Sequence, residues 1–131
     1  MPAYQTEGAA GFDIAAYLKE PFLLKAGARA LIPTGLFFEV PGGYEVQIRA
    51  RSGLAIRSGI GLVNGIGTID SDYRGEIKIP LINWDSHDFV IHDGDRIAQA
   101  VLSHYERADL QLTEELSRTE RDDGGFGHTG V

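Results

Sequence analysis

Apolar and polar residues alternate along most of the chain with a period of two. The alternation is clearest in residues 44–51 (YEVQIRAR), 76–83 (EIKIPLIN) and 89–102 (FVIHDGDRIAQAVL). Successive side chains of a β-strand point to opposite faces of a sheet, so this pattern predicts half-buried strands. Because the apolar segments are short and turn residues recur about every 8–12 positions, we expect an all-β sandwich or barrel.

The phase of the alternation also predicts which side chains share a face. Within residues 96–102 it places Ile97, Gln99 and Val101 on one face and the remaining four residues on the other.

Proline positions and one helical signal complete the prediction of elements. Pro33, Pro41 and Pro80 interrupt apolar segments. Because proline has no N–H to give to a strand ladder, they predict sheet edges or turns. Helix signals are scarce, and a single short helix is expected near residues 51–59 (RSGLAIRSG), with Ser52 as its cap.

Length and composition narrow the class of protein. With 131 residues, of which 43% are hydrophobic, the chain is expected to form one domain with its own core. Apolar content falls from residue 117 onward, so we expect a β-domain at 1–116 and a flexible C-terminal arm at 117–131. No apolar segment approaches the roughly 18 residues of a membrane span. The absence of cysteine excludes disulfides and is compatible with a cytoplasmic location.

The charge of the chain argues against one class of partner and leaves another open. The net charge of −7 does not favour nucleic-acid binding, which needs a basic face. The cations are nevertheless concentrated: Arg49, Arg51 and Arg57 lie close together, and Arg118 and Arg121 lie near the end. A small anionic ligand is therefore compatible with the sequence.

Two polar groups interrupt apolar sequence in the first half of the chain. Asp13 lies within AAGFDIAA, where an aspartate is either a turn former or a functional carboxylate. Arg51, Ser52 and Gly53 lie where a strand passes into the expected helix. Backbone N–H groups, a hydroxyl and a guanidinium converge in this way at many phosphate sites, and a helix start with a surface arginine is the alternative.

A third candidate is the segment NGIGTIDSDYRGE (64–76). It places Asn64 and Asp70 on two sides of an expected β-hairpin. Asp70 follows Thr-Ile in an apolar context and is expected to face a cleft, where a carboxylate can orient and deprotonate a water. Asp72 is interpreted as a structural residue that pairs with Arg74 or caps the turn.

The arm carries the fourth candidate, RDDGGFGHTG (121–130). Its Arg121 can bind a phosphate and its Phe126 can stack on a base, whereas a disordered end without a task is the alternative. The four histidines show no metal-ligand spacing, and no Gly-x-Ser-x-Gly nucleophile motif occurs.

Taken in order, five segments resemble the trimeric, all-β dUTP diphosphatases (dUTPases). They are AAGFDIAA (9–16), RSGLA (51–55), NGIGTIDSDYRGEI (64–77), GDRIAQAVL (94–102) and RDDGGFGHTG (121–130). The chain departs from the family pattern at Ala50, where proline is usual, and at Asp122, where glycine is usual. Asp122 adds a negative charge near an expected phosphate.

The resemblance implies a distorted jelly-roll (β-clip) barrel that assembles as a homotrimer, with the C-terminal arm exchanged between subunits. It implies hydrolysis of dUTP to dUMP and pyrophosphate, in which water attacks the α-phosphorus and Mg²⁺ lies on the triphosphate. Such a reaction limits uracil incorporation into DNA and supplies dUMP for dTMP synthesis.

The resemblance also implies roles for individual residues. Asp70 would hold the attacking water and contact the deoxyribose 3′-OH, and Tyr73 would pack against the sugar and exclude a 2′-OH. Asn64 and the neighbouring backbone would read uracil. Asp13 would orient a water in the shell of the metal.

The arm would complete the site, with Arg121 on the γ-phosphate and Phe126 over the uracil. The substrate-binding residues implied by the resemblance are Arg51, Ser52, Gly53, Asn64, Gly67, Thr68, Ile69, Asp70, Tyr73, Lys78, Gln99, Arg121, Phe126 and Gly127.

Two other functions are alternatives to hydrolysis of dUTP. The dCTP deaminases share the fold, but Pro80 stands where their active-site glutamate would lie, and proline cannot act as an acid or base. A jelly-roll binding module without activity would need neither a water-orienting carboxylate nor an arginine on a mobile arm.

Overall fold

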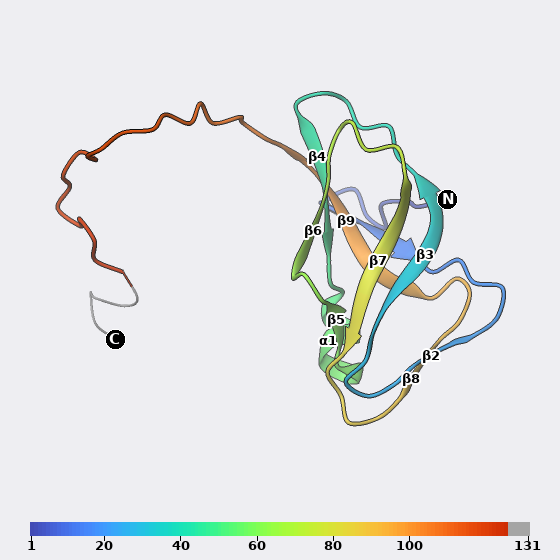
Figure 1. Ribbon diagram of the computed structural model, residues 1–131. Helices are drawn as coiled ribbons and strands as arrows, with labels where there is room; N and C mark the ends of the chain where they lie inside the picture. The colour runs from blue at the N-terminus through green and yellow to red at the C-terminus, as the bar shows by residue number, and fades with distance from the viewer. Residues whose placement is uncertain (126–131) are drawn as a thin grey trace.

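The computed structural model describes residues 1–125, which form nine β-strands and one short helix (Figure 1). The all-β class predicted from the alternating pattern is confirmed. The elements are β1 (Phe12–Ala15), β2 (Phe22–Leu24), β3 (Arg29–Phe37), β4 (Tyr44–Arg49), α1 (Ser52–Ser58), β5 (Ile60–Leu62), β6 (Ile66–Ile69), β7 (Glu76–Asn83), β8 (Phe89–Ile91) and β9 (Arg96–His104).

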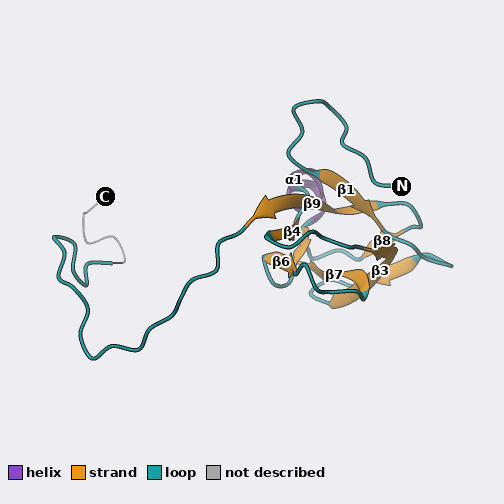
Figure 2. Ribbon diagram, turned by 90° about the horizontal axis from the view of Figure 1, so that it is seen from above, coloured by secondary structure: helices purple, strands orange, loops and turns teal. Residues whose placement is uncertain are grey.

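The strands pair antiparallel in three sheets. The largest has the order β1-β9-β4-β6, the second has the order β3-β7-β5, and β2 pairs with β8. Figure 2 shows β1 and β9 along one side of the body and β3 and β7 along the other. Aliphatic side chains of both large sheets form one buried core, among them Ile14, Ile48, Ile77 and Ile79.

Strand β9 departs from the predicted alternation. Ile97 and Ala98 were expected on opposite faces, but both are buried. The cause is a bulge in the ladder with β1, because Ile14 pairs with Ala98 while the next residue, Ala15, pairs with Arg96. Ile97 is therefore an extra residue on β9, and a bulge shifts the pleat so that two successive side chains can face the core.

Pro80 lies inside the central strand β7, not at an edge or turn as predicted. Its carbonyl accepts a hydrogen bond from the N–H of Val63 (3.0 Å), which follows the last residue of β5. The N and C=O of one residue point to the same edge of a strand, so the missing N–H of Pro80 faces the point where β5 has ended. Pro33 lies on the edge strand β3, as predicted.

The predicted helix is confirmed as α1, but Ser52 is not its cap. The N-cap is Arg51, which has extended backbone dihedrals and makes no capping hydrogen bond with its side chain. The helix ends at Gly59, whose φ of 62° lies in the left-handed region that glycine favours. No helix in the described part of the chain is long and apolar enough to cross a membrane.

The segment around Asn64 is a crossing between sheets and not the predicted hairpin. Strand β5 pairs with β7, whereas β6 pairs with β4, so the two successive strands belong to different sheets. Gly65, with a φ of 72°, lies in the turn between them. Asn64 is exposed at this crossing.

After β9 the chain leaves the body. Residues 105–125 contain no helix or strand, and in Figure 1 they extend away from the sheets. Leu110, Leu112 and Leu116 are at least 86% exposed. The predicted boundary between residues 116 and 117 falls within this extended segment.

We expect Gly59→Ala to lower the free energy of unfolding by at least about 1 kcal/mol. A residue with a side chain is strained at this φ, and a β-carbon at position 59 would lie 2.8 Å from the backbone nitrogen of Asp85. Urea denaturation followed by circular dichroism measures the change. Gly42→Ala is the matched control, because the space around Gly42 is open and its φ is outside the left-handed region. Equal effects of the two substitutions would contradict this account.

Candidate active site

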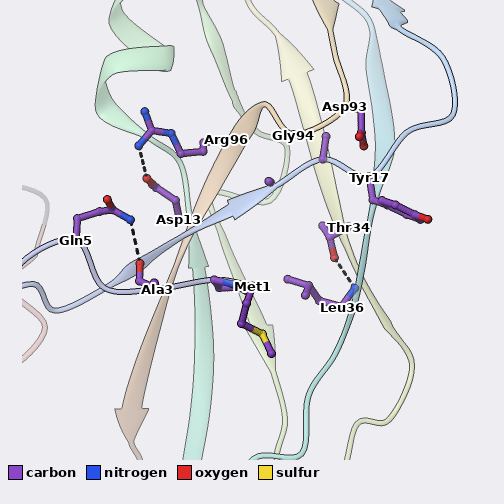
Figure 3. A pocket seen from close by; sticks show the side chains of 13 residues that line it. Met1, Ala3, Gln5, Asp13, Tyr17, Thr34, Leu36, Asp93, Gly94 and Arg96 are labelled. Carbon is purple, nitrogen blue, oxygen red and sulfur yellow. Dashed lines mark hydrogen bonds and ion pairs between the residues drawn. The ribbon is translucent and has the colours of Figure 1, made fainter.

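Asp13, Arg51 and Arg96 form an ion-paired group, called here the arginine cluster. Arg51 Nε lies 2.9 Å from Asp13 Oδ1, and Arg96 Nη1 lies 3.1 Å from Asp13 Oδ2. Figure 3 shows the Asp13–Arg96 pair. Asp13 lies on β1 and Arg96 begins β9, while Arg51 follows β4. Since β9 pairs with both β1 and β4, the register of the largest sheet brings the three side chains together.

The arginine cluster is suited to an anion. Its two guanidinium groups and one carboxylate leave a net positive charge. Arg51 is also fixed from a second side, because its Nη1 donates to the backbone carbonyl of Arg96 (3.0 Å). Ser52 and Gly53 follow in the first turn of α1, where backbone N–H groups have no partner within the helix. Phosphate oxygens accept hydrogen bonds from both kinds of donor.

Two further polar side chains lie beside the cluster. Gln99 is exposed and pairs with Asp13 on β1 and with Arg49 on β4. The guanidinium of Arg57 lies 3.1 Å from the position that a β-carbon of Gly53 would take, so it folds back over the start of α1. The predicted site residues Asp13, Arg51, Ser52 and Gly53 are thus brought together. The guanidinium of Arg57 adds a further cation over the start of the helix.

Arg96 is a site residue that sequence reasoning missed. It lies 83 positions from Asp13, so no local spacing connects the two. The available signal was its place in GDRIAQAVL, the segment that also carries Gln99. A cavity of about 370 Å³ opens beside the pair, and Met1 and Tyr17 contribute to its lining (Figure 3).

Asp70 lines a second cavity, called here the Asp70 pocket, of about 450 Å³. This volume is within the usual range for small-molecule sites. The prediction that Asp70 faces a cleft is confirmed, although its side chain is exposed and not buried at an edge. The lining residues are Leu31, Thr68, Ile69, Asp70, Tyr73, Glu76, Ile77 and Lys78.

The turn after Asp70 is fixed by hydrogen bonds to its backbone. The N–H of Tyr73 donates to the Asp70 carbonyl (3.2 Å), and Arg74 Nη1 donates to the carbonyls of Ser71 (2.7 Å) and Tyr73 (3.0 Å). The predicted pairing of Asp72 with Arg74 was wrong. The carboxylate within salt-bridge distance of Arg74 is Glu39, at 3.9 Å, because the guanidinium turns toward the backbone of its own turn.

Glu76 is the other site residue that the sequence did not indicate. Its Oε1 accepts the N–H of Gly35 (3.0 Å), at the irregularity where β3 and β7 shift register. The hydrogen bond from Gly35 holds the pKa of Glu76 below its usual value, and Lys78, 3.5 Å away, acts in the same direction. Glu76 therefore stays ionised and keeps the ammonium of Lys78 at the border of the Asp70 pocket.

The arginine cluster and the Asp70 pocket lie at opposite ends of β4. Arg49 of β4 pairs with Ile66 of β6. Arg51 continues two residues past Arg49 in one direction, and Asp70 lies four residues past Ile66 in the other. Six residues of extended strand correspond to roughly 20 Å at about 3.3 Å per residue. A single chain does not bring these two groups of predicted site residues together.

The remaining predicted residues lie on the crossing, on β6 and on the arm. Gly67 is packed so closely that a β-carbon would lie 3.2 Å from Ile48 and 3.6 Å from the amide nitrogen of Asn64. Arg121 is on the extended segment and its Nε donates to the carbonyl of Gly124 (2.8 Å). Phe126 and Gly127 lie outside the described residues.

Asp85, Ser86 and His87 contain the residue types of a hydrolase triad but not its geometry. Asp85 Oδ1 and Ser86 Oγ both contact the same ring nitrogen of His87, Nδ1, at 3.1 and 3.2 Å. A triad histidine uses one nitrogen for each partner. The hydrogen bond from His87 also lowers the pKa of Asp85. Residues 1–125 contain no group of three or more His, Asp or Glu side chains placed to hold a metal ion.

Comparison with known proteins finds relatives that match nearly the whole of this chain. The family model for dUTPase matches residues 1–130. The deoxyuridine 5′-triphosphate nucleotidohydrolase of Finegoldia magna is 52% identical, over 99% of this chain and 91% of its own. The enzyme of the same name from Treponema denticola is 53% identical, over 100% of this chain and 91% of its own. Among solved structures, Staphylococcus bacteriophage 80alpha dUTPase with dUPNHPP has a TM-score of 0.86 at 26% identity, covering 100% of this chain and 92% of the phage chain.

The hydrogen bond between Gly35 and Glu76 should make a contribution to stability that is lost in acid. A carboxyl group whose pKa is lowered on folding stabilises the folded state above its usual pKa, and this contribution disappears as the pH falls through the lowered pKa. We expect the difference in urea midpoint between the wild-type chain and Glu76→Gln to be full at pH 7 and to shrink on acidification below pH 4.5. A difference that does not change with pH would contradict this role.

Proposed function

As a member of the dUTPase family, the chain hydrolyses dUTP to dUMP and pyrophosphate, and we propose that it does so as a homotrimer with active sites shared between subunits. The observation that carries the proposal is the separation of the arginine cluster from the Asp70 pocket. The α-phosphorus of dUTP is joined to the sugar through one oxygen. Groups that contact the sugar and groups that bind phosphate must therefore lie within one nucleotide of each other, which they do not in a single chain.

A neighbouring subunit that presents its arginine cluster to the Asp70 pocket meets this requirement. The pocket then holds the nucleoside, with Tyr73 against the sugar and Asn64 near the uracil. The neighbouring subunit supplies Arg51 and Gln99 to the triphosphate. The other contacts in this proposal are the backbone of Gly67, Thr68 and Ile69 to the base, Lys78 at the pocket border, and Ser52 and Gly53 to the phosphates.

Asp70 is the residue that acts on the water in this mechanism. Its carboxylate holds the water in line with the α-phosphorus and accepts a proton from this water as it attacks. Pyrophosphate leaves on the opposite side of the phosphorus. The positive arginine cluster opposes the charge that spreads over the phosphate oxygens as the bond breaks. Negative charge also develops on the pyrophosphate as its bond to the α-phosphorus breaks. Arginines that bind this leaving group stabilise the charge and so favour breaking of the bond.

Magnesium is part of the proposal as an ion held mainly by the triphosphate. When bound, Mg²⁺ neutralises phosphate charge, and it is usually held by one or two carboxylates together with substrate phosphates. Asp13 supplies one carboxylate at the arginine cluster. Each of its oxygens already accepts one guanidinium N–H, and a carboxylate has about four acceptor positions. It can thus also accept a hydrogen bond from a metal-bound water.

The arm is proposed to close the site from a third subunit, with Arg121 on the γ-phosphate and Phe126 over the uracil. Leu110, Leu112 and Leu116 support this placement, because these apolar side chains are at least 86% exposed in the described part of the chain. A cytoplasmic location is also part of the proposal and rests on the absence of cysteine.

A direct assay tests the reaction against the nearest alternative. Pyrophosphate release from dUTP is measured beside ammonia release from dCTP. A dUTPase releases pyrophosphate from dUTP and no ammonia from dCTP, whereas a dCTP deaminase releases ammonia from dCTP.

Replacing the water-holding carboxylate should abolish most of the turnover. Asp70→Asn preserves shape but accepts a proton poorly, so kcat should fall by at least ~10²-fold, the scale of general-base catalysis. Binding of a non-hydrolysable dUTP analogue should change far less. Asp72→Asn is the matched control, since Asp72 is exposed on the same turn. Near-normal turnover of Asp70→Asn would show that another group holds the water.

Removing the arm should separate folding from activity. A chain that ends at Thr119 loses no buried apolar side chain of the described residues, so its thermal unfolding should match the wild type. Its activity should nonetheless drop steeply, because water is no longer excluded from the site.

Mixing two inactive chains then tests the sharing of sites. One chain carries Asp70→Ala with an intact arm, and the other ends at Thr119 and keeps Asp70. When they are refolded together, sites with both parts form only if the arm and Asp70 come from different subunits. We expect activity to return in the mixture. No recovery, with mixed trimers detected by mass, would mean that each arm closes over its own Asp70.

A further inference from the structure

The phenol ring of Tyr73 lies directly over Gly75. Its hydroxyl donates to the backbone carbonyl of Glu76 (3.1 Å), so the side chain reaches forward along the chain and covers Gly75. A β-carbon at position 75 would lie 2.6 Å from Tyr73 Cζ and 3.0 Å from Cε2, and still closer to the hydroxyl oxygen. The ring therefore occupies the space that any side chain at position 75 would need.

Backbone conformation does not require glycine at this position. The φ of Gly75 lies outside the left-handed region, in contrast to Gly59, Gly65 and Gly94. The φ of this position therefore gives no reason to exclude an alanine. The phenol of Tyr73 is the neighbour that conflicts with it, so the glycine at 75 provides space for the ring and not freedom for the chain.

We propose that Gly75 is the positioning residue for Tyr73 and thereby controls the selection of deoxyribose over ribose. The inference rests on the proposed function, in which the Tyr73 ring packs against the sugar. Gly75 touches no substrate. It acts because the missing side chain lets the ring reach the Glu76 carbonyl, and that hydrogen bond fixes the face that the ring presents to the Asp70 pocket.

The size of the conflict determines the expected effect. To regain an ordinary contact of about 3.5–4.0 Å, the ring must retreat by roughly 1 Å, which also breaks its hydrogen bond to Glu76. Exclusion of a 2′-OH depends on contact between ring and sugar, and misplacements of about 1 Å can change rates by about 10²-fold. Tyr73 is 45% exposed, so it can move without unfolding the sheet beneath it.

The test compares kcat/KM for dUTP and UTP in four proteins: wild type, Gly75→Ala, Tyr73→Ala and the double variant. We expect Gly75→Ala to raise the UTP-to-dUTP ratio by at least ~10-fold. The double variant should have the same ratio as Tyr73→Ala alone, because no ring is left to displace. Tyr73→Phe measures the loss of the hydrogen bond by itself and should give a smaller change.

Gly42→Ala is the control for adding a methyl group to an exposed loop glycine, and its ratio should equal that of the wild type. A ratio within about twofold of wild type for Gly75→Ala overturns the proposal. So does a change that persists undiminished in the Tyr73→Ala background, since the methyl group would then act without the ring.

A crystal structure of Gly75→Ala without nucleotide tests the geometry independently of catalysis. We expect the Tyr73 hydroxyl to lie beyond hydrogen-bonding distance of the Glu76 carbonyl. A ring in its original place refutes the positioning role even if dUTP is hydrolysed. Conversely, a wild-type chain that releases no pyrophosphate from dUTP refutes the proposed function, while a displaced ring still supports the steric role of Gly75.

Discussion

The register of strand β4 is the constraint on which the arrangement of the site depends. β4 is hydrogen-bonded on both edges, with Arg49 paired to Gln99 of β9 and to Ile66 of β6. The edge that pairs with β9 sets which residues of β4 lie beside the start of β9. The edge that pairs with β6 sets the position of Asp70, the residue that follows β6. A slip of one residue on either edge would turn every side chain of that strand to the other face. The arginine cluster and Asp70 are therefore placed by the same backbone ladder.

Several polar side chains of the site are anchored on backbone groups in addition to their ion pairs with one another. Arg51 donates to the Arg96 carbonyl, Tyr73 to the Glu76 carbonyl, and Glu76 accepts the Gly35 N–H. Each backbone partner belongs to a strand or its border, so it moves little when a ligand arrives. Anchoring of this kind reduces the side-chain entropy that binding would otherwise have to remove.

Much of the fold was predictable because it follows from local pattern, and the exceptions are long-range. The alternation in residues 76–83 gave the buried face of β7 correctly, and the short helix follows directly from RSGLAIRSG. The extra residue Ile97 was not predictable, since a bulge appears only when β9 pairs with β1. The prediction that Pro80 marks an edge or a turn was wrong for a similar reason. Its missing N–H costs little stability only because β5 has already ended beside it, and this pairing cannot be seen in the local sequence.

The candidate site shows the same division between local and long-range information. Asp70 and Tyr73 stand in one motif, and the structure places both in the lining of one pocket. Arg96 and Glu76 were missed because their partners, Asp13 and Gly35, are distant in sequence. Gly75 could be seen in the sequence, but its meaning could not, since it depends on where the Tyr73 ring folds.

Placing the two halves of the site apart on one chain also has an electrostatic consequence. An arginine that binds phosphate and a carboxylate that accepts a proton attract each other, and a direct pair would neutralise both. Here Asp13 is the carboxylate held against Arg51 and Arg96, so Asp70 faces its pocket without an arginine partner among the described residues. In the assembly that we propose, the arginine cluster and Asp70 meet with a polyanion between them. The negative triphosphate then lies between the Asp70 carboxylate and the arginines. The carboxylate stays available to the water, while the arginines hold the phosphates.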